Sequence, residues 1–283
     1  MKILVTGYTG QLGYDVVKEG RRNNFEMYGV GSKDLDITVQ QKVNKYVEDL
    51  NPDAIIHCAA YTAVDKAEDD RETCWKVNVE GTKNLAEVAK KVGAKFLYVS
   101  TDYVFDGKGE TPFKETDQTT PINYYGLTKY EGEEIVQKTL DSFIVRISWV
   151  FGLNGKNFIR TMLRLADSNK EVSVVGDQIG SPTYTYDLAK LIIDMIQTEK
   201  YGIYHATNEG FCSWAQFAQE IFKQSNKGVK VKVIPTIDFP TPAVRPKNSR
   251  LAKTKLQDNG FTRLPKWQDA LTHFLNELNH EVK

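Results

Sequence analysis

Three polar side chains in the middle of the sequence have the types and spacing needed to reduce a ketone. Thr101 follows the apolar run 94–99, so we expect it where a buried strand ends. Tyr125 and Lys129 are four residues apart, which places them side by side on one face of a helix. A hydroxyl can polarise a carbonyl group by hydrogen-bonding its oxygen. A phenol that faces this hydroxyl and has an ammonium beside it can give the same oxygen a proton. Thr101, Tyr125 and Lys129 are therefore the predicted catalytic group.

Each member of this group has a separate expected task. A free phenol has a pKa near 10, so a tyrosine that donates a proton near neutrality needs its anion stabilised. A cation one helical turn away provides this, and we expect Lys129 to lower the pKa of Tyr125. Thr101 would hydrogen-bond the carbonyl oxygen as charge develops there. The alternative, a packed tyrosine and a solvated lysine, is disfavoured by the order of the motifs along the chain.

Such a reduction also needs a hydride donor, and the first thirteen residues indicate where that donor binds. A strand-like run ends in Gly7, Gly10 and Gly13, and a helix-like segment follows. Gly7 allows a tight turn, Gly10 allows the backbone to approach a pyrophosphate, and Gly13 allows close packing of helix on strand. The N–H groups at the helix start face the phosphates. The spacing differs from the usual Gly-x-Gly-x-x-Gly, and a purely structural glycine turn is the alternative.

Composition limits the classes of partner. The 283 residues carry 37 basic and 37 acidic side chains, so no electrostatic footprint for nucleic acid or an anionic membrane exists. No apolar run approaches the roughly 18–20 residues of a membrane span, and the first residues lack a signal-peptide pattern. Three unclustered cysteines and four histidines without metal-ligand spacing predict a cytoplasmic protein that has neither disulfides nor a catalytic metal.

Strand-like and helix-like segments alternate in the first half of the chain. We expect strands over 3–6, 26–30, 53–59, 96–100 and 143–149, and helices over 12–22, 39–50, 73–91 and 129–140. This alternation is typical of an α/β protein with a doubly wound, Rossmann-like parallel sheet. Ligands of such sheets bind outside the carboxyl ends of the strands. The glycine turn, segment 59–62 and Thr101 should therefore meet at one crevice.

The pattern loosens after about residue 150. We expect helices over 157–167, 186–197, 214–224 and 267–278, and strands over 172–175, 202–206 and 231–234. The predicted domains are a dinucleotide-binding domain over 1–150, to which segment 184–205 returns, and a smaller substrate-binding lobe formed mainly by 151–283. Segment 235–246 holds four of the nine prolines, so it is either a binding loop of that lobe or a plain surface connection.

The order of these motifs resembles that of the extended short-chain dehydrogenase/reductases, which act on nucleotide-sugars. Nearly the whole chain is similar to the dTDP-4-dehydrorhamnose reductase family of that superfamily. The resemblance is carried by 57–68 (HCAAYTAVDKAE), 100–107 (STDYVFDG), 146–152 (RISWVFG), 177–183 (DQIGSPT) and 243–249 (AVRPKNS). It implies NAD(P)H-dependent reduction of the C4 ketone of dTDP-4-dehydro-L-rhamnose to dTDP-L-rhamnose, the last step in making that sugar donor.

The resemblance also implies roles by position. Thr101, Tyr125 and Lys129 fall on the catalytic triad of the family. The implied cofactor-binding residues are Gly7, Gly10, Gln11, Leu12, Gly13, Asp36, Ile37, Ala59, Ala60, Tyr61, Tyr125 and Lys129. The implied substrate-binding residues are Tyr103, Val104, Phe105, Trp149 and Arg245. A guanidinium forks onto two phosphate oxygens, so Arg245 would hold the nucleotide diphosphate. A surface role for Arg245 and a core role for Trp149 are the alternatives.

Related activities differ in how well the sequence accommodates them. Nucleotide-sugar 4,6-dehydratases carry Asp-Glu after the threonine, whereas this chain has Asp102-Tyr103, so a dehydration would lack its base. A reductase or epimerase acting on another nucleotide-sugar stays open. A non-catalytic reading also stays open, because a regulatory subunit of methionine adenosyltransferase resembles the same family and binds NADP.

The cofactor is predicted to be NADPH, with NADH accepted. Ser32 and Lys33 would meet a 2′-phosphate, whereas Asp34 would hold the ribose 2′-hydroxyl of NAD. The protein is expected to be a monomer or a homodimer. Some family members dimerise around a magnesium ion bridged by glutamates. These glutamates are not identified here, and position 15, in the loop region that would supply one, is Asp15.

Overall fold

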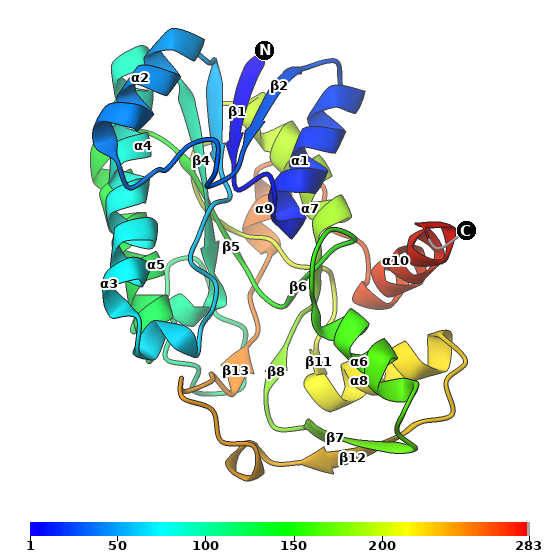
Figure 1. Cartoon of the computed structure of the whole chain (residues 1–283). Helices are drawn as coiled ribbons and strands as arrows, with labels where there is room; N and C mark the ends of the chain where they lie inside the picture. Colours follow the sequence, from blue (N-terminus) through cyan, green and yellow to red (C-terminus); the bar gives the residue numbers. More distant parts are fainter. Residues whose placement is uncertain (282–283) are drawn as a thin grey trace.

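The central sheet of the computed structural model, which describes residues 1–281, consists of six parallel strands (Figure 1). They are β1 (Lys2–Thr6), β2 (Glu26–Val30), β3 (Ala54–His57), β4 (Lys95–Thr101), β5 (Phe143–Ile147) and β10 (Gly202–His205). Their order is β10–β5–β4–β3–β1–β2, so the chain moves from β1 outward to β2 and then returns to the other side of β1. Ligands bind at such a reversal, outside the carboxyl ends of the strands.

Alternate residues of the strands face two layers of helices. In β1, Ile3 and Val5 face one layer and Leu4 faces the other. One layer contains α1 (Gln11–Arg22) and α7 (Thr185–Ile196), and the other contains α2 (Gln40–Leu50), α4 (Gly81–Val92) and α5 (Tyr124–Thr139). The layers flank the sheet on its two sides in Figure 1. The predicted doubly wound α/β fold is confirmed.

The helix expected over 73–91 is interrupted. It consists of α3 (Arg71–Trp75), a π-helical turn (Lys76–Glu80) and α4. Asn78 lies in the π-turn, where its side chain accepts a hydrogen bond from the Tyr61 N–H at 2.8 Å and donates one to the Tyr61 carbonyl at 3.2 Å. Such turns often occur at functional sites. Here the turn directs Asn78 toward the segment that follows β3.

The chain after β5 builds a smaller lobe, drawn in the lower half of Figure 1. Its helices are α6 (Phe158–Ala166), α8 (Trp214–Gln224) and α10 (Trp267–Glu281), and its strands are β6 (Val150–Phe151), β7 (Glu171–Val175), β8 (Ile179–Gly180), β9 (Thr183–Tyr184), β11 (Cys212–Ser213), β12 (Lys230–Ile234) and β13 (Asn248–Ser249). Aromatic side chains such as Phe151, Phe217 and Phe274 fill its core. By contrast, β10 and the short helix α9 (Thr254–Asp258) pack on the central sheet.

A buried ion pair fixes α5 to the sheet. Glu133 of α5 and Arg146 of β5 are 0% and 2% exposed, and the guanidinium donates hydrogen bonds to both carboxylate oxygens at 2.9 and 2.6 Å. Ser100 of β4 donates a further hydrogen bond to Glu133. Buried charges require such partners. The pair therefore fixes the position of α5 over β4 and β5.

We predict that Glu133→Gln lowers the free energy of unfolding by about 3–5 kcal/mol, because Arg146 keeps its buried charge and loses the compensating carboxylate. Urea denaturation measures this change. Glu134→Gln is the matched control, since Glu134 of the same helix pairs with the exposed Lys138 at 2.9 Å, and we expect its effect to stay below about 0.5 kcal/mol. Equal losses in the two variants would contradict the assigned role of the buried pair.

Candidate active site

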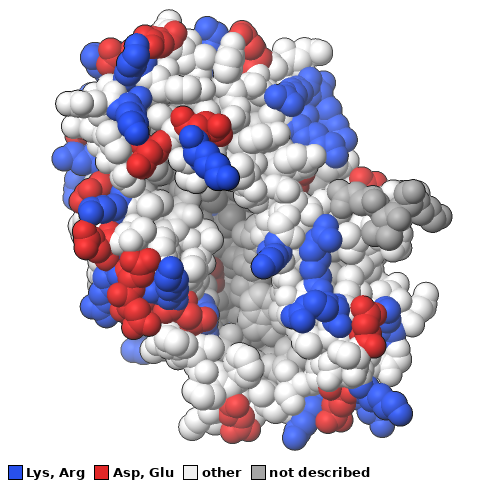
Figure 2. All heavy atoms as spheres, in the orientation of Figure 1, with Lys and Arg blue, Asp and Glu red and all other residues white. Residues whose placement is uncertain are grey.

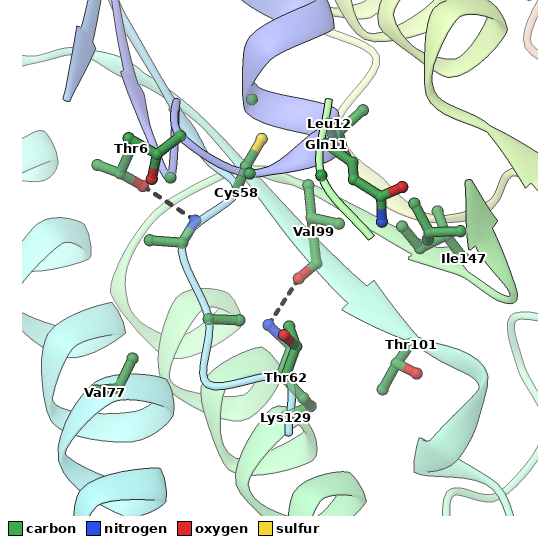
Figure 3. A pocket seen from close by; sticks show the side chains of 18 of the residues that line it. Thr6, Gln11, Leu12, Cys58, Thr62, Val77, Val99, Thr101, Lys129 and Ile147 are labelled. Atoms are coloured by element: carbon green, nitrogen blue, oxygen red, sulfur yellow. Dashed lines mark hydrogen bonds between the residues drawn. The ribbon is translucent and has the colours of Figure 1, made fainter. Parts of the chain in front are cut away.

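A cavity of about 610 Å³ lies at the carboxyl ends of the central strands (Figure 3). Its wall contains the glycine turn after β1, residues Cys58 to Ala60 and Thr62 after β3, and Thr101 at the end of β4, so the three features expected to meet do so. Tyr125 and Lys129 of α5 complete this side. Figure 2 shows this face hollowed between the upper and lower parts of the molecule. The volume lies in the range of small-molecule and cofactor sites.

The glycine turn has the geometry that its spacing predicts. Gly7 has a φ of +74°, and a Cβ placed there would lie 2.6 Å from the backbone nitrogen of Ala59. A Cβ at Gly13 would lie 2.4 Å from the Gly7 carbonyl oxygen, so only glycine allows α1 to approach the turn this closely. No side chain caps the start of α1 at Gly10. The backbone at the start of α1 is therefore accessible to an anion.

A segment from the second half of the chain, residues 152–157, crosses the glycine turn, and we call it the strap. The Asn154 amide donates hydrogen bonds to the carbonyl oxygens of Thr9 at 3.0 Å and Gly10 at 3.1 Å. The Gln11 side chain in turn accepts hydrogen bonds from the Gly152 N–H at 2.9 Å and the Asn157 amide at 3.0 Å. These contacts were not predictable from the sequence, because their partners are more than 140 residues apart.

Thr101 and Asp102 form a polar wall at the end of β4. The Thr101 hydroxyl accepts a hydrogen bond from the Tyr103 N–H at 3.2 Å and donates one to Asp102 Oδ1 at 3.1 Å. Asp102 is 3% exposed, and among the described residues its Oδ2 has no hydrogen-bond partner. Burial raises the pKa of Asp102 to about 6. Because buried polar atoms are normally hydrogen-bonded, Oδ2 suits a polar group of a ligand. The sequence analysis used Asp102 only to exclude a dehydratase.

The start of α5 positions Tyr125 and Lys129. Asn123 caps this helix by accepting a hydrogen bond from the Gly126 N–H at 2.8 Å, so the helix begins at Tyr124 rather than at 129. Lys129 is 2% exposed, and its ammonium donates a hydrogen bond to the Val99 carbonyl at 2.7 Å, drawn in Figure 3. The predicted catalytic group is therefore assembled from β4 and α5.

Burial controls the proton affinity of this group. It lowers the pKa of Lys129 to about 7 and raises the pKa of Tyr125. The charges of Asp102 and Tyr103 raise the pKa of Tyr125 further, and a hydrogen bond with Thr101 acts in the opposite direction. In this structure burial dominates the pKa of Tyr125 and the Lys129 ammonium bonds to the Val99 carbonyl, so the lowering of the Tyr125 pKa by Lys129 stays a prediction. The phenol consequently keeps its proton near neutral pH.

Arg245 does not line the cavity itself but contacts Tyr103, which does. Its guanidinium donates hydrogen bonds to the Tyr103 hydroxyl at 2.9 Å and to the Asp65 carboxylate at 2.6 Å. Tyr103 lines the cavity and meets the Tyr125 ring edge-on, with centroids 5.7 Å apart. The Asp65–Arg245 pair, which sequence reasoning missed, joins the segment after β3 to the proline-rich loop 235–246.

Besides Arg245, three of the predicted site residues do not line the cavity. Val104 and Phe105 are 0% exposed and pack with Leu251 in a small core, because the 3₁₀ turn Asp102–Val104 directs the following side chains inward. Tyr61 is half-buried, and its hydroxyl donates a hydrogen bond to Asp70 at 3.1 Å. The structure thus places these three side chains beside the site rather than in its wall.

The end of β2 forms the far end of the cavity. Asp36 and Ile37 line it, as the resemblance implies, and so does Ser32. Asp34 instead accepts a hydrogen bond from the Gly31 N–H at 2.8 Å. Lys33 is exposed and does not line the cavity. Of the three side chains considered for cofactor choice, Ser32 is the one that faces the site.

Asp15 is a packing residue here. It is 6% exposed and accepts a hydrogen bond from the Thr185 hydroxyl at 2.5 Å, which links α1 to α7.

Within residues 1–281, no cluster of three or more His, Cys, Asp or Glu side chains is arranged to hold a metal ion. In the same part of the chain, no helix is both long enough and apolar enough to span a bilayer.

The doubly wound sheet, the glycine turn and the Thr101–Tyr125–Lys129 group facing one cavity define an extended short-chain dehydrogenase/reductase. The family model described as the RmlD substrate binding domain matches residues 1–280. The chain belongs to this family.

The relatives are similar over nearly their whole length. The dTDP-4-dehydrorhamnose reductase of Aggregatibacter actinomycetemcomitans is 42% identical, over 95% of this chain and 97% of that protein. The crystal structure of a dTDP-4-dehydrorhamnose reductase from Clostridium acetobutylicum has a TM-score of 0.96 and 42% identity, covering 99% of this chain and 100% of that one. That of the Bacillus anthracis enzyme, in complex with NADP, has a TM-score of 0.95 and 43% identity, covering 98% and 100%.

We predict that Lys129 makes the stability of the protein depend on pH. Folding lowers the pKa of Lys129 from 10.5 to about 7, so between these values the unfolded chain binds the extra proton and stability rises with pH, by up to about 1.4 kcal/mol per pH unit. Lys129→Met removes this group. The excess stability of the variant over the wild type should therefore shrink as pH rises from 7 toward 10.5.

Urea denaturation at several pH values tests this expectation. Lys138→Met is the control, because the Lys138 side chain is 74% exposed on the same helix, and its difference from the wild type should not vary with pH. A constant difference for Lys129→Met would show that Lys129 keeps its charge when buried.

Proposed function

We propose that the protein catalyses the NAD(P)H-dependent reduction of the C4 ketone of dTDP-4-dehydro-L-rhamnose to dTDP-L-rhamnose. The observation that carries this proposal is the convergence of Thr101, Tyr125 and Lys129 with the glycine turn on one cavity, in a chain whose relatives are named dTDP-4-dehydrorhamnose reductases. We assign the reaction to the cytoplasm, in keeping with the three free cysteines.

Each catalytic side chain acts on a stated atom. When bound, the reduced nicotinamide supplies a hydride to C4 of the sugar. Tyr125 donates its phenolic proton to the C4 oxygen, which the Thr101 hydroxyl hydrogen-bonds as its negative charge grows. Lys129 holds the ribose hydroxyls of the cofactor, and its ammonium form offsets the charge left on Tyr125. Asp102 Oδ2 accepts a hydrogen bond from a sugar hydroxyl.

The residues of the cavity fit a dinucleotide. The uncapped start of α1 suits the pyrophosphate, and the Ser32 hydroxyl faces the end of the cavity where the adenine ribose belongs. The relative from Bacillus anthracis is in complex with NADP. We therefore assign NADPH as the cofactor and expect NADH to be accepted.

The substrate occupies the other end of the cavity. Trp149 lines the wall there and Tyr103 lies above the catalytic phenol, while Arg245 takes the diphosphate. In this assignment, residues 1–150 bind the dinucleotide together with segment 184–205, which contains α7 and β10. Residues 151–283 mainly form the substrate-binding lobe. Val104 and Phe105 support the Thr101 turn from the core rather than touching the sugar.

Nicotinamide absorbance tests the proposal directly. Purified protein is mixed with NADPH and freshly generated dTDP-4-dehydro-L-rhamnose, with NADH in a parallel reaction. Absorbance loss that matches the substrate consumed supports the reductase. An epimerase would return its hydride and leave the absorbance unchanged over many turnovers. A regulatory subunit would bind NADPH without consuming it.

We predict that Tyr125→Phe lowers kcat by about 10²- to 10⁴-fold, because the variant lacks the proton that the C4 oxygen must receive. The dissociation constant of NADPH, read from its fluorescence, should change little. Tyr124→Phe is the matched control, since Tyr124 is the preceding residue of α5 and does not line the cavity. Near-normal turnover of Tyr125→Phe would remove Tyr125 from the mechanism.

We also predict that Ser32→Glu weakens NADPH binding at least about tenfold more than NADH binding, because the new carboxylate faces the 2′-phosphate that only NADPH carries. Fluorescence titration with each cofactor gives the two dissociation constants. Lys33→Ala should leave their ratio unchanged, since Lys33 does not line the cavity. An equal effect of Ser32→Glu on both cofactors would place the 2′-phosphate elsewhere.

A further inference from the structure

Trp149 has a backbone conformation that is rare for a bulky residue. Its φ is +49°, and the other described non-glycine residues with positive φ are all asparagines, namely Asn24, Asn51 and Asn226. Asparagine tolerates the left-handed region, whereas an aromatic residue is strained there. Such strain persists only where surrounding contacts enforce it. The contacts around Trp149 therefore identify the residues that hold it in place.

The main ring contact of Trp149 is Trp214. The two indoles are stacked, with centroids 3.7 Å apart and planes inclined by 15°. Trp214 is the first residue of α8, and the helix start is fixed by reciprocal hydrogen bonds between Ser213 and Gln216 at 3.1 and 2.8 Å. Phe158 packs against the Trp214 ring with centroids 4.6 Å apart. Trp214 thus offers the Trp149 ring a surface that is itself held on several sides.

The backbone on both sides of the strained residue is also held. The Trp149 carbonyl accepts a hydrogen bond from the Thr183 N–H at 3.1 Å, and the Ser148 carbonyl accepts one from the Thr183 hydroxyl at 2.5 Å. A Cβ at Gly180 would lie 2.8 Å from the Trp149 ring, so the indole occupies space that only a glycine leaves open. The indole accordingly has one defined position in the wall.

Trp149 lines the cavity, whereas Trp214 does not. We propose that Trp214 is a positioning residue for the substrate: by stacking, it holds Trp149 in the left-handed conformation and presents the indole to the sugar ring. This inference rests on the proposed function. Ile147, two residues before Trp149, pairs in register with Thr101. This pairing places the indole near the reacting C4 of the substrate rather than near the adenine of the cofactor, so we expect it to contact the sugar ring.

The kinetic test compares Trp214→Ala with Trp214→Phe. We expect Trp214→Ala to lower kcat/KM for dTDP-4-dehydro-L-rhamnose by about 10- to 100-fold, as expected for a misplaced reactant, with the dissociation constant of NADPH unchanged. Trp214→Phe keeps a ring for stacking and should restore most of the loss. Wild-type kcat/KM in Trp214→Ala would overturn the inference.

A double-mutant cycle with Trp149→Ala separates positioning from general damage to the lobe. If Trp214 acts only through Trp149, Trp214→Ala adds no further loss in the Trp149→Ala background. Equal factors in both backgrounds would overturn the inference, because they would mean that Trp214 acts independently of Trp149. This outcome would leave the proposed reaction intact.

A spectroscopic readout needs no turnover. Two stacked indoles couple their excited states and give a pair of far-ultraviolet circular dichroism bands of opposite sign. We expect this pair in the wild type, its loss in Trp149→Phe and Trp214→Phe, and its retention in Trp267→Phe, since the Trp267 ring contacts Phe217 in the lobe core. Saturating dTDP-L-rhamnose should change the bands, whereas dTDP alone should change them less. Bands that do not respond to dTDP-L-rhamnose would overturn the inference even if the wild type were inactive.

Discussion

The site depends on how α5 is fastened to the sheet by buried charged groups. Tyr125, Lys129 and Glu133 are spaced four residues apart and form one stripe along the helix. The Lys129 ammonium bonds to the Val99 carbonyl of β4, and Glu133 pairs with Arg146 of β5. Neither polar group can be left in the interior without its partner, so the two contacts together fix the position of the helix. In that position Tyr125 and Thr101 line the same cavity, so the arrangement of the candidate site follows from interactions in the core.

The same burial sets the protonation of the site. Removing Lys129 and Tyr125 from water favours the neutral form of each, with the pKa of Lys129 near 7 and that of Tyr125 above its usual value. A protonated phenol is the form that a proton donor needs. An anionic cofactor favours the ammonium form of Lys129, because an opposite charge stabilises it. Under the proposed function, this ammonium form would offset the negative charge that develops on Tyr125.

Local sequence features predicted the parts of the site that local physics determines. Gly7 and Gly13 are needed because a Cβ at either position would collide with backbone, and the apolar run before Thr101 ends as a strand does. Interactions between distant segments were not predictable in this way. The Asp65–Arg245 pair joins residues 180 positions apart, and nothing around either residue identifies its partner. Val104 and Phe105 belong to a motif that resembles a substrate-binding one, yet the turn at Asp102 directs both into the core.

The strap connects the smaller lobe to the glycine turn. Asn154 bonds to carbonyl oxygens of the glycine turn rather than to its N–H groups, so the lobe fixes the shape of the turn and leaves the donors at the start of α1 for the pyrophosphate. Asn154, Gly155 and Lys156 of the strap also line the cavity. The lobe therefore fixes the glycine turn through its backbone, while Trp149 contributes to the wall of the same cavity. A small number of contacts between the two halves of the chain therefore fixes the relative positions of the glycine turn and the lobe.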